Sequence, residues 1–207
     1  PRVRRQRQMC IRDRNLPEKL TDGPEMVLRG ACVGLQKMTY LPGHGVYEYP
    51  YTPESFPWFY DKEQWIKYLD MLVANRMNSL YLWNGHPFAS LVKLEDYPFA
   101  LEVDEETFKK NEEMFSFLTE EADKRGIFVI QMFYNIILSK PFAEHYGLRT
   151  QDRNRPITPL IADYTRKSIA AFIEKYPNVG LLVCLGEAMC TVCLLYTSPS
   201  PRDTERS

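Results

Sequence analysis

The feature that most constrains the fold is a regular alternation of apolar runs with amphipathic segments. Four short apolar runs suit buried strands, and the three segments between them place apolar residues at helical spacing. The expected strands cover residues 26–36, 79–84, 127–134 and 180–186, and the expected helices cover residues 61–76, 104–125 and 158–175. Connections of this length can join parallel strands. The order predicts an α/β fold on a parallel sheet, and the unbroken apolar runs predict that both faces of the sheet are covered.

Two arrangements of such a sheet, a closed barrel and an open sheet, fit the loop lengths. The loops after the first three strands are long, whereas the chain returns quickly after each helix. This contrast favours a partial (β/α)8 TIM barrel, comprising its first four strands and three helices, with an elaborated carboxyl face. An open doubly wound sheet is the alternative. Neither GxGxxG nor GxxxxGK[ST] occurs, so we expect no nucleotide cofactor.

The two ends of the chain differ in character from its middle. Residues 9–13 read Met-Cys-Ile-Arg-Asp, and residues 193–197 read Cys-Leu-Leu-Tyr-Thr. The DNA ATGTGTATAAGAGACA encodes the first, and its reverse complement encodes the second, so both resemble translated adapter DNA from sequencing libraries. We expect residues 1–14 and 192–207 to be non-native tails and residues 15–191 to be native. The alternative is a basic targeting arm and a Ser/Pro-rich linker.

Charge and hydropathy argue against two classes of binding partner, nucleic acid and membrane. Without the six arginines and one aspartate of residues 1–14, the formal net charge falls from −1 to about −6, which leaves no basic stripe for nucleic acid. No apolar run reaches the roughly 18 residues of a membrane span. We therefore expect neither nucleic acid nor membrane as a partner of this segment. Cys32 and Cys184 lie in apolar runs and are expected to be small core residues.

Polar and aromatic residues follow each expected strand. They are Gln36 after the first, Trp83, Asn84 and His86 after the second, Tyr134 and Asn135 after the third, and Glu187 after the fourth. The carboxyl ends of parallel strands meet at one rim, where barrel enzymes place their active sites. Amides exchange hydrogen bonds with hydroxyl groups, and aromatic faces stack on the C–H surfaces of sugars. The set predicts a carbohydrate substrate bound by the six neutral residues.

Other chemistries are less well supported by the pattern. His44, His86 and His145 are spread over three loops without an His-x-His motif, so we expect no metal.

Residues 37–60 form a long aromatic loop, which could be a wall for a sugar ring or a loop packed on its own side chains. Glu187 could serve as a catalytic acid with a raised pKa, cap the following helix or pair with Arg149.

Short motifs resemble the catalytic barrels of the α-glucuronidase and β-N-acetylhexosaminidase glycoside hydrolases. They are Leu28-Arg29-Gly30, the Phe56–Tyr60 segment leading to Trp65, the Arg76–Trp83 segment, and the Tyr176-Pro177 helix end before a strand closing in Gly186-Glu187. In those families an acid at the fourth strand end protonates the leaving oxygen, a role the resemblance implies for Glu187. The Asp-Glu pair of the hexosaminidases is absent, which favours an α-glucuronidase-like or another exo-acting glycosidase.

These observations predict the N-terminal half of a glycoside hydrolase barrel that degrades polysaccharide or glycan side chains. The second carboxylate that such catalysis needs is expected beyond residue 191. We expect the 207-residue chain alone to be inactive, and a periplasmic or extracellular location for a bacterial enzyme of this kind. The alternatives are a non-catalytic carbohydrate-binding barrel and an open-sheet α/β enzyme of another class.

Overall fold

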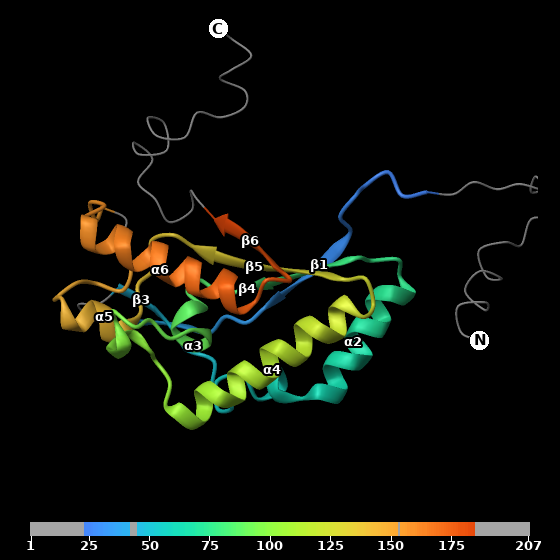
Figure 1. The fold of residues 1–207 in the computed structure, drawn as a ribbon, viewed down its shortest axis with the longest axis horizontal. Coiled ribbons are helices and arrows are strands. Elements are labelled where there is room, and N and C mark those ends of the chain that lie inside the picture. Colours follow the sequence, from blue (N-terminus) through green and yellow to red (C-terminus); the bar gives the residue numbers. More distant parts are fainter. Residues whose placement is uncertain (1–22, 42–44, 153, 185–207) are drawn as a thin grey trace, which may run out of the picture.

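A parallel sheet organises the molecule. The computed structural model describes residues 23–41, 45–152 and 154–184. Strands β1 (Gly30–Gly34), β4 (Ser79–Trp83), β5 (Phe128–Tyr134) and β6 (Val179–Cys184) form a parallel sheet in the order β1-β4-β5-β6 (Figure 1). Strand order follows chain order, without the reversal that defines a doubly wound sheet. The prediction of an α/β fold with four strands is confirmed.

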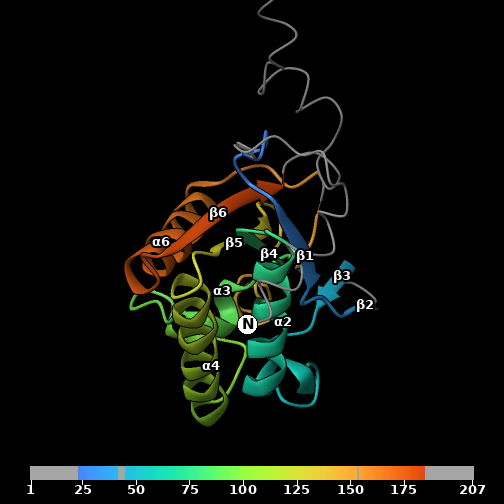
Figure 2. The ribbon, with the colours of Figure 1, turned by 90° about the vertical axis from the view of Figure 1, so that its right-hand side faces the viewer.

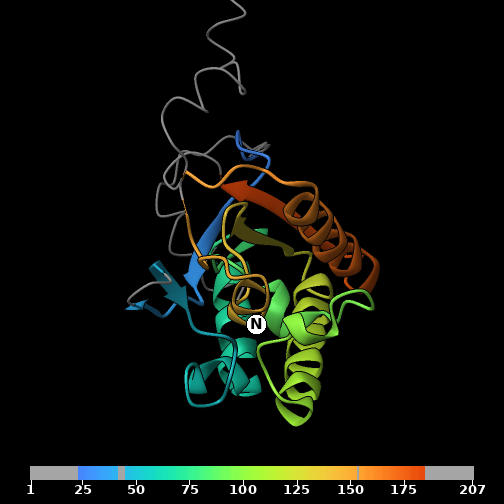
Figure 3. The same cartoon turned by 90° about the vertical axis from the view of Figure 1, so that its left-hand side faces the viewer.

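Three long helices cover a single face of this sheet. They are α2 (Lys62–Ala74), α4 (Glu105–Asp123) and α6 (Pro159–Lys175), and Figures 2 and 3 show all three on the same side of the strands. The core beneath them joins Leu80, Leu82, Val129 and Phe133 of the sheet to Leu69, Phe115 and Phe172 of the helices. Helices on one side of strands that follow chain order are the arrangement of a partial (β/α)8 barrel.

The expectation that both faces of the sheet are covered is not met within the part of the chain that the structure describes. Cys32 is exposed rather than a core residue, and Cys184 is half-buried. On β6, Leu182 and Val183 are 37% and 42% exposed, because this strand is an edge of the sheet. Apolar runs therefore identified the strands correctly, but not how many of their faces the described helices bury.

Several element boundaries differ from the sequence prediction. The first strand is confined to Gly30–Gly34, and Met26 and Val27 before it are 72% and 84% exposed. Part of the expected 37–60 loop forms an antiparallel hairpin of β2 (Met38–Leu41) and β3 (Gly45–Glu48). Four short helices were not predicted: η1 (Pro57–Tyr60), α3 (Phe88–Leu91), η2 (Pro98–Ala100) and α5 (Lys140–His145). Each is too short to show a helical period.

Side chains cap the starts of the three long helices. The Asp61 carboxylate accepts a hydrogen bond from the backbone N–H of Gln64 at 2.9 Å, and the Thr158 hydroxyl accepts one from Ile161 at 3.3 Å. Asp104 caps α4 in the same way. These bonds satisfy backbone donors that the first turn of a helix leaves open.

The amino ends of β1 and β4 are joined by Arg29 and Gly30. The Arg29 N–H donates to the Asn78 side chain at 2.8 Å, and its guanidinium donates to the carbonyl of Arg76, which has a φ of 60°. A Cβ at Gly30 would lie 2.2 Å from the carbonyl oxygen of Ser79. The Arg-Gly pair is thus explained by close strand packing at the end of the sheet opposite the expected site.

An ion-pair cluster attaches α6 to the loop before α4. The Asp163 carboxylate pairs with Lys167 at 2.7 Å and accepts a hydrogen bond from Tyr97 at 2.8 Å. These contacts lower its pKa to about 2, below the ordinary value of about 4. Their stabilising contribution is therefore present above about pH 4 and is lost as the pH falls toward 2.

We expect the unfolding temperature of the complete protein to fall less steeply between pH 4 and pH 2 in the Asp163→Asn variant than in the wild type. Calorimetry across this range measures the difference. Asp123→Asn, an exposed position at the end of α4, serves as the matched control. An Asp163→Asn profile parallel to the wild-type profile would contradict the assignment.

Candidate functional site

Three of the expected ligand-binding residues gather at the carboxyl ends of the strands. Trp83 donates its indole N–H to the Gln36 side-chain oxygen at 2.7 Å. The rings of Trp83 and Tyr134 meet edge to face, with centroids 4.8 Å apart and an interplanar angle of 82°. All three side chains are half-buried. Trp83 and Tyr134 lie on the sheet face that the helices leave uncovered, because their strand positions alternate with the core-facing ones. Gln36 lies two residues beyond β1 and contacts Trp83.

Asn84 stabilises this rim through side-chain hydrogen bonds to the backbone. Its side chain is 2% exposed. Its amide donates to the carbonyl of Leu35 at 2.6 Å and its oxygen accepts from the backbone N–H of His86 at 2.8 Å. Both ends of the amide are therefore occupied by the backbone. Asn84 joins the ends of β1 and β4 and fixes the turn after β4.

His86 is turned into the protein rather than toward the rim. Its Nε2 lies 2.9 Å from the Tyr164 hydroxyl of α6, and its ring packs edge to face on Phe88. Burial lowers the pKa of His86 to about 3, so the imidazole is neutral at ordinary pH. Sequence reasoning missed Tyr164, whose place on a helix gave no sign of a polar partner. The contact suits a structural hydrogen bond between the turn and α6.

Asn135 and Glu187 complete the expected set. Asn135 directly follows β5 and is half-buried. Glu187 lies outside the described residues. In the sequence it follows Cys184 by three residues, and Cys184 is paired with Tyr134 in the β5–β6 ladder. Arg149, its alternative partner, is exposed.

The described part of the aromatic loop packs on itself. Tyr51, Phe56 and Phe59 are at most 3% exposed, with ring contacts between Tyr51 and each phenylalanine. The buried Asn111 side chain of α4 donates to the carbonyls of Tyr51 and Ser90 at 2.9 and 3.1 Å and accepts from the Tyr60 hydroxyl. Burial in turn raises the pKa of Tyr60. Of the two interpretations of this loop, self-packing is therefore the one that residues 49–60 support.

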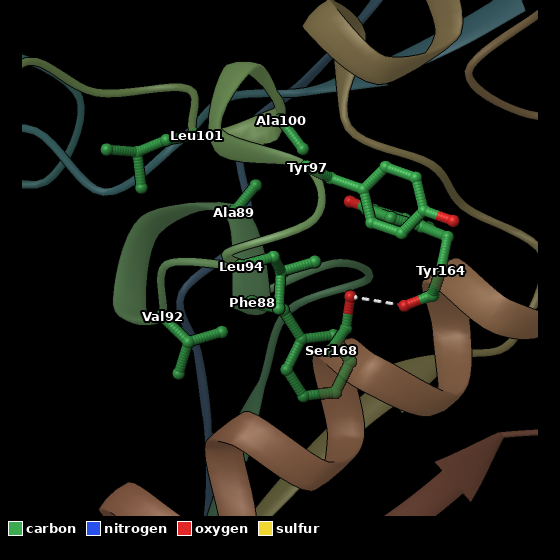
Figure 4. Close-up of a pocket in the computed structure, with 9 residues that line it drawn as sticks. All are labelled: Phe88, Ala89, Val92, Leu94, Tyr97, Ala100, Leu101, Tyr164 and Ser168. Atoms are coloured by element: carbon green, nitrogen blue, oxygen red, sulfur yellow. Dashed lines mark hydrogen bonds between the residues drawn. The ribbon is translucent and has the colours of Figure 1, made fainter.

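A pocket among the described residues has neither Gln36, Trp83 nor Tyr134 in its lining. It is lined by α3, the η2 segment and α6, and has room for about one water molecule. Figure 4 shows that its lining is mostly apolar, with the Ser168 hydroxyl turned to the Tyr164 carbonyl at 2.9 Å. This is a packing gap between helices, not a substrate site.

The described residues contain neither a metal-binding cluster nor a membrane-spanning helix. No three His, Cys, Asp or Glu side chains gather there in a way that could hold a metal ion. His44 lies outside the described part, and the His145 ring stacks on Phe99 with centroids 4.1 Å apart. Within the same residues no helix has both the length and the apolar character needed to cross a bilayer.

A solved structure resembles this chain closely. It is described as a "GH138 enzyme targeting pectin rhamnogalacturonan II", and the match has 89% sequence identity and a TM-score of 0.78. The match covers 82% of this chain but 20% of the other, so the chain spans about a fifth of that enzyme's length. No protein-family model and no curated protein matches.

Proposed function

We propose that this chain is part of a GH138 glycoside hydrolase that acts on pectin rhamnogalacturonan II. The observation that carries the proposal is the 89% identity over 82% of the chain to an enzyme so described. At this identity the ligand-facing residues of the shared segment are expected to serve the same purpose. The rhamnogalacturonan II polysaccharide is accordingly the proposed substrate.

Within this proposal, residues 15–191 form the first half of a (β/α)8 catalytic barrel. The tails 1–14 and 192–207 are of adapter origin, a division that rests on the two adapter-like sequences at residues 9–13 and 193–197. The uncovered sheet face would form the interior of the closed barrel. Its carboxyl rim, which carries Gln36, Trp83 and Tyr134, would face the substrate.

Glu187 is the proposed general acid, which protonates the leaving glycosidic oxygen. It follows the fourth strand, as the resemblance to the α-glucuronidase and hexosaminidase barrels implies. A second carboxylate from a later strand end would act as nucleophile or base. Asn84 and His86 hold the rim through backbone and Tyr164 contacts rather than by touching the sugar. Asn135, directly after β5, remains a proposed ligand contact.

The proposal is tested with the complete protein that carries this segment. We expect it to release new reducing ends from rhamnogalacturonan II and to leave an unrelated polysaccharide such as starch intact. Isothermal calorimetry with the same polysaccharides measures binding separately. Binding of rhamnogalacturonan II without hydrolysis would replace the proposal by a non-catalytic carbohydrate-binding barrel, and neither binding nor hydrolysis would reject both.

A further inference from the structure

The chain's one Asn-Gly pair, Asn84-Gly85, directly follows β4. An asparagine amide before glycine is open to attack by the next backbone nitrogen, because glycine has no Cβ to hinder the approach. The Gly85 nitrogen forms a bond to the Asn84 Cγ, the Cγ–Nδ2 bond breaks, and ammonia leaves with the proton of the Gly85 N–H. Water then opens the cyclic imide to aspartate or isoaspartate. The reaction needs no enzyme, so the structure determines whether Asn84 is modified.

The folded protein restrains the side chain that would react. The Asn84 amide nitrogen donates to the Leu35 carbonyl at 2.6 Å, and the amide oxygen accepts from the His86 N–H at 2.8 Å. These two bonds fix the plane of the amide. Ring closure requires the Gly85 nitrogen to approach the face of that amide while its nitrogen departs, which needs a freedom of rotation that the two bonds remove.

The backbone of the pair is restrained as well. The Asn84 N–H donates to the Met132 carbonyl at 3.4 Å, and the Gly85 carbonyl accepts from the Tyr134 N–H at 3.0 Å. Both residues of the pair are buried, so water has little access to the N–H that must lose its proton. The reaction therefore depends on an opening of this part of the chain, and its rate is limited by the population of the open state.

The product would not fit the site that the asparagine occupies. An ionised aspartate only accepts hydrogen bonds, so an oxygen would replace the amide nitrogen that lies 2.6 Å from the Leu35 carbonyl oxygen. The two oxygens repel each other, and the charge would be placed where the native side chain is 2% exposed. Isoaspartate lengthens the main chain by a methylene group and would displace the bonds to Met132 and Tyr134.

We propose that Asn84 is a modification site that the fold protects: it deamidates only in states in which the end of β4 has opened, and the modified chain cannot regain the native arrangement there. Deamidation at Asn84 is then an irreversible step that follows opening. It limits how long the complete protein survives in conditions that unfold it. The nucleophile is the Gly85 nitrogen and the co-reactant is water.

A second Asn-Gly pair at an exposed site provides a matched control. Asn75 is exposed at the end of α2, and Arg76 after it has a φ of 60°, which glycine adopts readily. The complete Arg76→Gly protein is kept folded at mildly alkaline pH, and mass spectrometry of its peptides measures both conversions. We expect Asn84 to react at least about 30-fold more slowly than Asn75, the factor for an opening that breaks two hydrogen bonds, and at a similar rate in urea. Equal rates in the folded protein would overturn the proposal, whatever substrate the protein hydrolyses.

The fate of the product is tested separately. Asn84→Asp introduces the product directly and is expected to lower the urea-unfolding midpoint of the complete protein, whereas Asn75→Asp, at the exposed site, lowers it much less. When the wild-type protein is heated and cooled, chains modified at Asn84 are expected to accumulate with the time spent unfolded and to be absent from the refolded fraction. An Asn84→Asp protein as stable as Asn75→Asp, or refolded chains that carry the modification, would contradict the proposal.

Discussion

Replacing Asn111 with alanine is expected to destabilise the barrel segment by roughly 3–5 kcal/mol, among the largest effects of any single polar substitution in this fold. The side chain is fully buried and joins three elements through the carbonyls of Tyr51 and Ser90 and the hydroxyl of Tyr60. Alanine leaves two buried carbonyls and the hydroxyl of the half-buried Tyr60 without this partner. An unsatisfied buried group costs about 1–3 kcal/mol, so the losses add to a large total.

Asn75 supplies the matched control for this experiment. It is also an asparagine near a helix, but it is exposed and makes one side-chain hydrogen bond, to the carbonyl of Met71 at 2.8 Å. We expect Asn75→Ala to cost at most about 1 kcal/mol. Urea-unfolding midpoints of the complete protein and its two variants measure the difference. Equal midpoints for the two variants would show that the Asn111 contacts do not hold the loop.

The elements with a strong period could be predicted from the sequence. Helix α2 has a capping aspartate and apolar residues at helical spacing, and it lies at 62–74 within the predicted 61–76. The strands β4 and β5 likewise lie where apolar runs end in Asn84 and Asn135. In each case the local sequence signal and the tertiary packing favour the same structure, so the sequence pattern alone was sufficient to predict the element.

The hairpin and the short helices could not be predicted in this way. Four residues each in β2, β3 and α3 are too few to establish a period. Their formation depends on contacts distant in sequence, such as the Ser90 hydroxyl that accepts from the N–H of Tyr51, 39 positions away. The two interpretations of the aromatic loop could not be separated for the same reason, since the burial of Tyr51 depends on tertiary packing.

The rim residues separate into two groups that the sequence does not distinguish. Trp83 and Asn84 are neighbours at the end of one strand, yet Trp83 is on the uncovered face and Asn84 is 2% exposed. The alternation of side chains along a strand sends them to opposite faces. Counting polar residues after each strand therefore located the rim, and the structure was needed to assign a supporting role to Asn84 and His86.

Replacing Glu187 with glutamine in the complete protein is expected to lower kcat on rhamnogalacturonan II by about 10²–10⁴-fold, with little change in KM. Glutamine keeps the size and hydrogen-bonding atoms of the side chain but cannot deliver a proton to the leaving oxygen. Glu174→Gln, on the exposed side of α6, provides a matched control and should retain wild-type turnover.

The turnover of substrates with different leaving groups distinguishes a general acid from the other carboxylate of the site. An aryl glycoside with a dinitrophenolate leaving group departs without protonation, so a variant that lacks only the acid should cleave it at a rate much closer to that of the wild type. A nucleophile or base is needed for either substrate. If Glu187→Gln lost the polysaccharide and the activated glycoside to the same extent, Glu187 would be the nucleophile or base. If it lost neither, the acid would have to come from another strand end.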